Sequence, residues 1–384
     1  MTGSVTTQAG ALPRGILIFI HSLHGGGAER VAVDLAAQWA EAGVAVTLVT
    51  QADVASDVYA LHPAVARVSL GTAGDSGGGL QGLLANVRRV RALRAQIVRV
   101  QPDIVLGMMT TASVLAVLAA RGLPAKVIAT EHTHPPSQSL SGLWLRLRRW
   151  TYPRAAKVVA LTRDTAKWIE THVPGSRLAV IPNPVQWPLR RQSPELAPPG
   201  AQAGHILLGV GRLHPDKGFD VLLKAFAQLA PDHPEWRLVL LGEGTERARL
   251  TAQADALGLG GRVDLPGRAG NVGDWYARAD LYVLSSRVEG LSNTLLEAMA
   301  SGLAPVAFDC ETGPREIVRD GEDGLLVRPV EDPQALAAAL GGLMRDPARR
   351  EALATQAVAV RERFSTASVL ARWKAVFDDA LAGR

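Results

Sequence analysis

Two acidic residues in the second half of the sequence could bind the hydroxyl groups of a sugar. Glu289 follows the apolar run 280–284, which has the length of a buried strand. Ser292 or Asn293 can cap the helix expected next, so that the first amides of this helix can meet an anion. Glu297 then falls inside the helix. A nucleotide sugar needs this combination, because its hydroxyls bind carboxylates and its diphosphate binds amides and cations.

Two basic residues upstream, Arg212 and Lys217, follow the strand expected at 205–210 and could neutralise a diphosphate. Two acids at this spacing are common by chance, so the acid pair gains weight only with these cations. The stretch 210–220 resembles the diphosphate-binding arginine and lysine of the retaining glycosyltransferases of family 4. The stretch 285–300 resembles the acid pair of the same family. The resemblance runs over most of the chain and is stronger in the second half.

The resemblance implies the GT-B fold, an α/β architecture with two Rossmann-like domains facing each other across a cleft. It also implies a retaining glycosyltransferase that takes a sugar from a nucleotide-diphosphate donor, with a UDP-sugar favoured. The acceptor would be a glycan linked to polyprenyl diphosphate, and the process would be surface polysaccharide biosynthesis.

The resemblance assigns roles residue by residue. Arg212 and Lys217 would stabilise the leaving diphosphate, Glu289 would hold the donor sugar and favour an oxocarbenium-like centre, and Glu297 would bind the ribose. The expected donor-binding set is Gly26, Gly27, Arg212, Lys217, Gly267, Arg268, Glu289, Gly290, Asn293, Thr294, Leu295 and Glu297. Because fixed cations replace a metal ion, no metal site and no cofactor are expected. Ser292 stands where many members have proline, which leaves the subfamily open.

The chain length and the order of its apolar segments predict two α/β domains. Residues 1–187 are expected to form an N-terminal, acceptor-binding Rossmann-like domain, and residues 188–204 a linker without periodicity. Residues 205–364 should form the nucleotide-sugar-binding Rossmann-like domain. Residues 365–384 should form a C-terminal helix that crosses back to the first domain.

Two strand ends in the first half could meet a ligand. Gly26 and Gly27 close a glycine-rich loop after the strand expected at 15–20, and a tight turn without a ligand is an equal alternative. Glu131 and His132 follow another strand and are expected near the acceptor, because open parallel sheets bind ligands at such ends. Two nearby histidines could instead suggest a metal, but no third ligand is evident.

Charge is distributed unevenly along the chain, whose net charge is +5. Residues 1–187 carry 18 basic and 10 acidic residues, whereas the remainder carries 23 and 26. Segments 76–102 and 132–163 contain arginine but no acid, and the second also contains tryptophan. This composition fits an anionic membrane surface or a pyrophosphate-bearing acceptor. The alternative is that both segments pack on the sheet with solvated arginines. No nucleic-acid-binding motif is present, so no nucleic acid is expected as a partner.

Several further features limit the location and the class of protein. No apolar run is long enough to span a bilayer, and the first fourteen residues lack the pattern of a secretory signal. One cysteine, Cys310, excludes an internal disulfide and fits a reducing cytoplasm. We therefore expect a cytoplasmic protein, with peripheral attachment to the inner face of the cytoplasmic membrane as a second possible location. Two other functions stay open: a nucleotide-sugar epimerase using Glu131 and His132, and a non-catalytic protein whose cleft binds a sugar or nucleotide.

Overall fold

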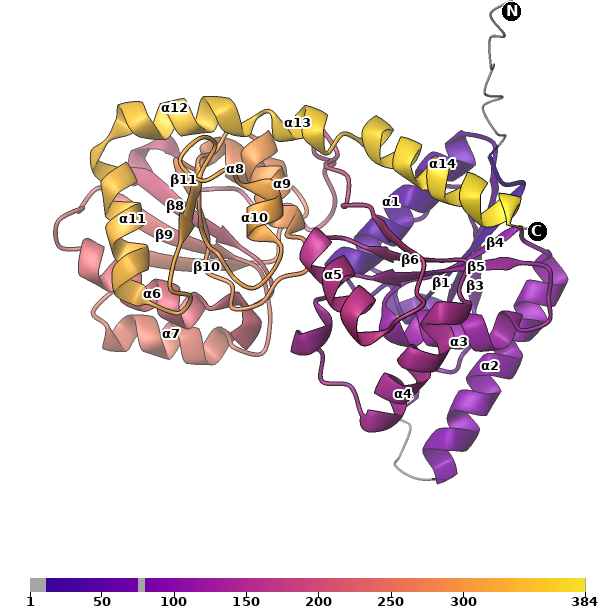
Figure 1. Cartoon of the computed structure of the whole chain (residues 1–384). Coiled ribbons are helices and arrows are strands. Elements are labelled where there is room, and N and C mark those ends of the chain that lie inside the picture. The colour runs from indigo at the N-terminus through magenta and orange to yellow at the C-terminus, as the bar shows by residue number, and fades with distance from the viewer. Residues whose placement is uncertain (1–11, 75–79, 384) are drawn as a thin grey trace, which may run out of the picture. The chain divides into compact units, whose positions relative to one another are not determined.

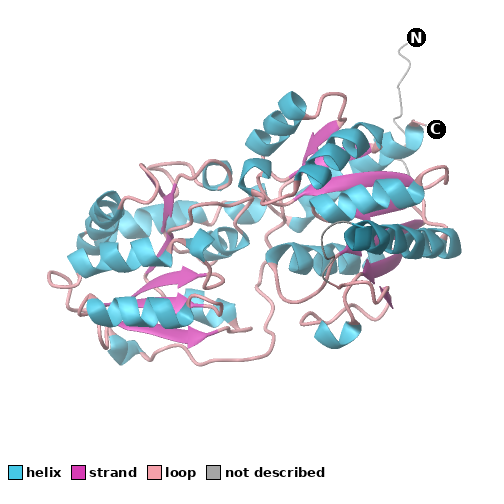
Figure 2. Cartoon of the chain, turned by 90° about the horizontal axis from the view of Figure 1, so that it is seen from below, coloured by secondary structure: helices cyan, strands magenta, loops and turns pink. Residues whose placement is uncertain are grey.

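The computed structural model describes residues 12–74 and 80–383, so most of the first fourteen residues lie outside the described part. The chain divides into two compact units, Met1–Pro182 with Val369–Arg384, and Asn183–Ser368. Each unit contains a parallel sheet with helices packed on it (Figures 1 and 2). None of the described helices is both long and apolar enough to cross a membrane.

The first unit is built on a seven-stranded sheet with the order β3-β2-β1-β4-β5-β6-β7. Its strands are β1 (Gly15–Ile20), β2 (Ala45–Thr50), β3 (Ala66–Ser69), β4 (Ile104–Gly107), β5 (Lys126–Glu131), β6 (Lys157–Ala160) and β7 (Leu178–Val180). Its helices are α1 (Gly27–Glu41), α2 (Leu80–Val100), α3 (Thr110–Ala120), α4 (Gly142–Thr151), α5 (Arg163–His172) and most of α14 (Thr366–Ala382). The strand order reverses between β1 and β4, which is where open parallel sheets bind ligands.

Strand β1 is apolar on both faces, as a buried parallel strand requires. Ile16 and Ile18 face a core that includes side chains of α1 and α14, whereas Leu17 and Phe19 face a core that includes α2, α3 and α5. Figure 1 shows α1 and α14 together on one face of this sheet. The continuous apolar run in the sequence therefore reflects a sheet that is covered on both sides.

Helix α14 joins the first unit through aromatic contacts. Trp373 and Phe377 lie edge-on to Trp39 of α1, with ring centroids 5.7 and 5.3 Å away. Such pairs contribute about 0.5–1.5 kcal/mol each beyond the area that they bury. The C-terminal end of the chain is thereby fixed to a unit formed mainly by its N-terminal half.

The second unit is built on a six-stranded sheet with the order β10-β9-β8-β11-β12-β13. Its strands are β8 (His205–Val210), β9 (Trp236–Leu241), β10 (Val263–Gly267), β11 (Leu281–Leu284), β12 (Pro305–Phe308) and β13 (Leu325–Val327). Its helices are α6 (Phe219–Leu229), α7 (Arg247–Ala256), α8 (Val272–Arg278), α9 (Asn293–Ala300), α10 (Pro314–Ile317), α11 (Pro333–Arg345), α12 (Pro347–Ala357) and α13 (Val360–Arg363). The strand order again reverses, here between β8 and β11.

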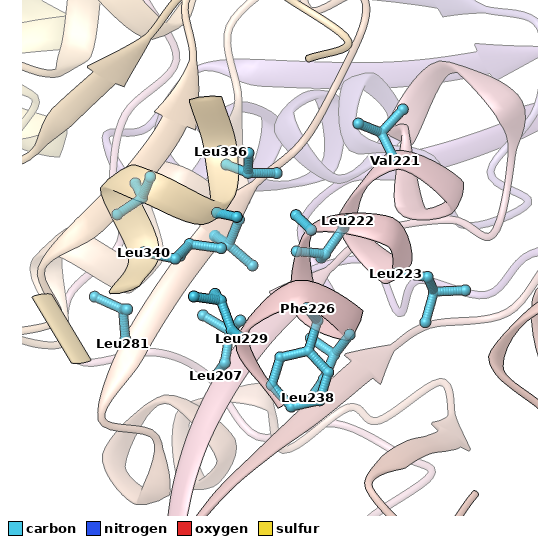
Figure 3. Close-up of a cluster of buried hydrophobic side chains, with 14 of the residues drawn as sticks. Leu207, Val221, Leu222, Leu223, Phe226, Leu229, Leu238, Leu281, Leu336 and Leu340 are labelled. Atoms are coloured by element: carbon cyan, nitrogen blue, oxygen red, sulfur yellow. The ribbon is translucent and has the colours of Figure 1, made fainter. Parts of the chain in front are cut away.

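The core of this unit forms where α6 and α11 pack on the sheet (Figure 3). Apolar residues at helical spacing on α6, among them Leu222 and Phe226, meet Leu207 and Leu238 of the strands. Leu340 of α11 completes the cluster. This packing holds β8 and α6 in place, and the loop that connects them carries predicted site residues.

Residues 188–204 belong to the second unit and lie along α8. Asn271 exchanges two hydrogen bonds with the backbone of Leu196, at 2.9 and 3.0 Å, and the Trp275 indole donates to the same carbonyl. Arg278 donates to three carbonyls of residues 199–204. Residues 188–204, which showed no periodicity in the sequence, therefore form an ordered segment. Side chains of α8 and of its N-cap hold this segment mainly by hydrogen bonds to its backbone.

Candidate functional site

The charged residues of the site come from two neighbouring strands at the reversal point of the second sheet. β8 pairs with β11 in parallel, with Leu207 opposite Leu281. The loop after β8 carries Arg212 and Lys217, and the loop after β11 carries Glu289. Because parallel strands end at the same edge, residues far apart in the sequence meet there.

The loop after β8 turns sharply and contacts the loop after β11. Residues Pro215–Lys217 form one 3-10 turn, and Gly218 follows with a φ of 60°. A Cβ atom on Gly218 would lie 2.1 Å from the Ser285 carbonyl oxygen, so only glycine fits. The Ser285 hydroxyl donates to the Lys217 carbonyl at 2.8 Å. Arg212 lies exposed on the same loop.

Lys217 and Glu289 form an ion pair across these loops. The ammonium Nζ lies 2.6 Å from Oε1 of Glu289, and the Ser286 hydroxyl donates to the same oxygen at 2.7 Å. The side chains are 20% and 7% exposed, so water screens the pair only weakly. The structure therefore brings Lys217, a predicted diphosphate-binding residue, into contact with Glu289, a predicted sugar-binding residue.

Helix α9 begins beside this pair, as predicted. The Ser292 hydroxyl caps the helix by accepting from the Leu295 amide at 3.4 Å. Gly290 approaches Gly313 closely: a Cβ on Gly313 would lie 2.6 Å from the Gly290 carbonyl oxygen. Asn293, Thr294 and Leu295 form the first turn of the helix, so the predicted phosphate-binding amides lie at its positive end.

Glu297 is buried in the second turn of α9, with 6% of its surface exposed. The Tyr276 hydroxyl of α8 donates to it at 3.2 Å. Tyr282 donates to the Thr294 hydroxyl at 2.9 Å, and the two tyrosine rings meet edge to face. Neither tyrosine was identified from the sequence, because nothing in a strand or helix pattern shows where a phenol hydroxyl will point.

Gly267 and Arg268 lie at the end of β10, the outermost strand on this side of the sheet. Gly267 has a φ of 106°, which favours glycine. Its carbonyl accepts from the Gly242 amide at 2.8 Å. The proposed contact with a nucleobase rests on this position alone.

Gly26 and Gly27 lie in the first unit, at the start of α1. Gly26 is the N-cap residue, and a Cβ there would lie 2.0 Å from the Glu29 carboxylate. The Ser22 hydroxyl donates to the other oxygen of Glu29 at 2.8 Å. The positive end of α1 therefore already faces a carboxylate of its own first turn, a feature that the glycine pattern did not predict.

Glu131, at the end of β5, lies inside a network of hydrogen bonds. It accepts from Thr110 at 2.7 Å, from Gln138 at 2.9 Å and from the Tyr152 hydroxyl, and Arg148 lies 3.9 Å away. Burial raises the pKa of its carboxyl, although these partners oppose the rise. The carboxylate is thus engaged within the protein, and its predicted contact with the acceptor stays a prediction.

His132 follows at the same strand end and is half-buried. Its Nδ1 atom is buried without a hydrogen-bond partner in the described part of the chain. Burial lowers the pKa of the imidazole to about 4. A neutral imidazole can hydrogen-bond a hydroxyl, and the predicted contact of His132 with the acceptor stays a prediction.

Two arginines of the predicted basic segments point into the first unit. Arg148 of α4 is 3% exposed and lies 4.9 Å from the centroid of the Trp168 ring. Arg89 of α2 is 7% exposed and donates to the carbonyls of Thr72 and Gly74. Both guanidinium groups bind interior partners, so neither of these two arginines is placed to meet an anionic membrane surface.

The predicted site residues therefore form two groups. Ten lie in the second unit around the ends of β8, β10 and β11: Arg212, Lys217, Gly267, Arg268, Glu289, Gly290, Asn293, Thr294, Leu295 and Glu297. Gly26, Gly27, Glu131 and His132 lie in the first unit. Among the described residues, no cluster of three His, Cys, Asp or Glu side chains could hold a metal.

Two family models match the chain. A model of Glycosyltransferase Family 4 matches residues 25–186, and a model of Glycosyl transferases group 1 matches residues 199–359. The first covers most of the unit that contains Gly26 and Glu131 and ends four residues beyond it, and the second covers the Lys217–Glu289 pair.

Two curated relatives span much of the chain. An exopolysaccharide phosphotransferase of Streptomyces coelicolor is 35% identical over 306 residues, which cover 78% of this chain and only 31% of that protein. A Campylobacter jejuni enzyme is 27% identical over 76% of this chain and 79% of its own length. Its name describes an α-1,4-N-acetyl-D-galactosaminyltransferase acting on an undecaprenol-PP-linked GalNAc glycan.

Solved structures confirm the predicted fold class. Sucrose-phosphate synthase from Thermosynechococcus elongatus matches with a TM-score of 0.83 and 20% identity, over 97% of this chain and 100% of that one. Anabaena HepE in complex with UDP-glucose matches with a TM-score of 0.75 and 21% identity, over 96% and 100%. At these identities the likeness shows the fold alone, which is GT-B with two Rossmann-like sheets.

Proposed function

We propose a sugar-transfer reaction for this chain, which belongs to the glycosyltransferases of family 4, group 1 type. The reaction moves a sugar from a nucleotide-diphosphate sugar to a glycan acceptor with retention of anomeric configuration. The observation that carries the proposal is the Lys217–Glu289 ion pair beside the capped start of α9. A cation, a carboxylate and helix amides thus lie at one edge of the sheet, where a sugar diphosphate needs all three.

In this proposal Lys217 and Arg212 bind the diphosphate and stabilise the charge that grows on it as it leaves. These two cations supply this stabilisation in place of a metal ion. The diphosphate competes with Glu289 for the Lys217 ammonium. Glu289 then turns to the hydroxyls of the donor sugar, and its charge favours the oxocarbenium-like transition state.

The remaining contacts bind the sugar donor in ground and transition states alike. Glu297, oriented by Tyr276, accepts hydrogen bonds from the ribose hydroxyls. The amides of Asn293, Thr294 and Leu295 and the backbone at Gly290 hold the phosphates, and the Leu295 amide exchanges its bond to the Ser292 hydroxyl for the phosphate. Gly267 and Arg268 border the base, and Gly26 and Gly27 stay predicted donor-binding residues.

A UDP-sugar is the proposed donor, and a lipid-linked glycan the proposed acceptor. The Anabaena protein of the same fold was solved with UDP-glucose, and the Campylobacter relative is named for an undecaprenol-PP-linked substrate. The excess of basic residues in the first half fits an acceptor that carries pyrophosphate. His132 binds an acceptor hydroxyl through its neutral ring. We place the reaction in surface polysaccharide biosynthesis.

An exposed apolar and basic face on the first unit supports attachment to an anionic membrane. We define this lipid-facing surface by exposed residues of α2 and α4, two helices that both pack on α3. Its members are Leu83, Leu84, Val87, Arg88 and Arg91 on α2, and Leu143, Leu145, Arg146 and Arg149 on α4. Such a surface combines apolar insertion with attraction to anionic head groups.

A nucleotide-sugar epimerase is the alternative with the same architecture. It would need Glu131 or His132 as a general acid or base. Glu131 is held by three hydrogen-bond donors and by Arg148, which leaves its carboxylate no position from which to take a substrate proton. This arrangement disfavours Glu131 as the acid or base, so an epimerase would have to use His132.

A screen of radiolabelled UDP- and GDP-sugars tests the proposal, with and without a polyprenyl diphosphate-linked glycan. We expect label to move to the glycan from one or a few UDP-sugars, and the Lys217→Ala variant to lose this transfer. Conversion of the nucleotide sugar without acceptor would support the epimerase. Binding of nucleotide sugars without any turnover would support the non-catalytic alternative.

A further inference from the structure

Arg287 lies two residues before Glu289 and makes an unusually full set of contacts. Its Nη1 and Nη2 atoms donate to the two carboxylate oxygens of Asp220, at 2.8 and 2.9 Å. Nη1 also donates to the Pro215 carbonyl at 2.6 Å, and Nε pairs with Glu331. Its backbone amide donates to the Asp216 carbonyl at 2.8 Å. None of these contacts is part of the proposed reaction.

These contacts join the two loops that carry Lys217 and Glu289. Pro215 and Asp216 precede Lys217 on the loop after β8, and Asp220 lies in the first turn of α6, which ends this loop, whereas Arg287 belongs to the loop after β11. A guanidinium that meets a carboxylate with two parallel hydrogen bonds fixes both distance and orientation. Arg287 is 26% and Asp220 18% exposed, so solvent competes little for the pair.

We propose that Arg287 is a positioning residue that holds Lys217 in register with Glu289. The proposal rests on the proposed function, in which the correctly positioned Lys217 and Glu289 side chains contact the sugar diphosphate. A cation that stabilises a developing charge must be preorganised, and a displacement of about 1 Å can reduce a rate roughly a hundredfold. Arg287 acts through Lys217 and does not itself touch the substrate.

The alternative is that Arg287 contributes only to stability. A matched pair within the same sheet separates the two explanations, because Arg237 of β9 also meets Asp264 of β10 through two nitrogen atoms, at 3.0–3.3 Å. The Arg237 side chain is 31% exposed, close to the value for Arg287. Arg237 contacts none of the predicted site residues in the described part of the chain.

Lysine substitutions test the proposal, because lysine keeps the charge but cannot form two parallel hydrogen bonds. We expect Arg287→Lys to lower kcat about ten- to a hundredfold, with a smaller change in KM for the sugar donor, and Arg237→Lys to leave both near wild type. Because Arg287 acts through Lys217, the Arg287→Lys/Lys217→Ala double variant should be no slower than Lys217→Ala. Equal effects of the two lysine variants, or additive losses in the double variant, would overturn the proposal.

A second measurement does not depend on the reaction. The NMR signal of the Lys217 ammonium in ligand-free protein, assigned with Lys217→Ala, should move in Arg287→Lys towards its position in Glu289→Gln. It should stay unchanged in Arg237→Lys. An unchanged Lys217 signal in Arg287→Lys overturns the positioning role even if the wild type transfers no sugar. Absence of transfer in the wild type, with the shift observed, contradicts only the proposed reaction.

Discussion

The ammonium of Lys217 lies 2.6 Å from the Glu289 carboxylate, although 72 residues separate them in the sequence. In the absence of a substrate, each side chain neutralises the other in a partly buried place. A diphosphate bound as proposed would exchange one anionic partner of Lys217 for another. The lysine charge would thus be compensated before and after binding, and the Glu289 carboxylate would gain the sugar hydroxyls as hydrogen-bond partners.

Replacement of Lys217 by alanine should reduce turnover strongly. Loss of one fixed charge beside the leaving diphosphate costs about 3 kcal/mol, or roughly a hundredfold in rate. The measurement is kcat with a saturating nucleotide sugar, beside circular dichroism to verify folding. Lys224→Ala, at an exposed position on α6, provides the control and should keep wild-type turnover. Equal kcat values for Lys217→Ala and wild type would remove Lys217 from the reaction.

Replacement of Glu297 by alanine should mainly weaken binding of the sugar donor, because the ribose contact is the same in ground and transition states. A hydrogen bond to a charged group contributes about 1.5–3 kcal/mol, so UDP affinity should fall roughly ten- to a hundredfold. Tyr276→Phe removes the hydroxyl that orients Glu297 and should weaken UDP binding less. Titration calorimetry with UDP measures both; unchanged affinity in Glu297→Ala would contradict the ribose assignment.

Sugar transfer should proceed without a divalent metal ion. Arg212 and Lys217 supply the positive charge that a metal would otherwise provide at the diphosphate. Transfer measured in excess EDTA should match transfer in its absence. A loss of activity that Mg²⁺ or Mn²⁺ restores would show that the two cations are not sufficient.

The lipid-facing surface should attach the protein to anionic vesicles in a salt-dependent manner. Each basic residue near such a surface contributes about 1 kcal/mol, and the attraction decays over about 8 Å at physiological ionic strength. Arg146→Glu/Arg149→Glu should therefore reduce sedimentation with phosphatidylserine vesicles by roughly thirtyfold or more in partition coefficient. Arg148 is left unchanged, because it is buried against Trp168.

Charge reversal elsewhere provides the control for this experiment. Arg345→Glu/Arg349→Glu makes the same change in net charge on exposed residues of the second unit and should leave sedimentation unchanged. Equal sedimentation with neutral and anionic vesicles, or equal loss in both double variants, would favour the alternative in which the arginines of α2 and α4 are merely solvated.

His132 should stay neutral until the pH falls to about 4, the value to which burial lowers its pKa. The unfolded chain binds this proton near pH 6.5. Above about pH 6.5 the ring is neutral in both states, and as the pH falls towards 4 the unfolded chain binds this proton while the folded chain does not, so the stability of the fold decreases. Proton NMR of the imidazole, assigned with His132→Asn, measures the titration. A midpoint near 6.5 would show that the ring is solvated.

The sequence by itself determined the elements and the outline of the site, because these depend on local patterns. Apolar runs at 15–20 and 205–210 predicted β1 and β8, since a strand covered on both faces is apolar throughout. Ser292 or Asn293 before helix-forming residues predicted a cap for α9, since capping needs only neighbouring residues, and the cap is Ser292. The placement of Arg212, Lys217 and Glu289 at strand ends followed from the order of these elements.

Only the tertiary structure decided which charged side chains meet. Arg287 and Asp220 are 67 residues apart and pair because β8 and β11 are neighbours in the sheet, a relationship that no local pattern contains. Arg148 and Arg149 are adjacent and equally basic, yet one is buried against Trp168 and the other is exposed. Successive residues on a helix point about 100° apart, so the direction of each guanidinium is set by the packing of α4 on its neighbours rather than by composition.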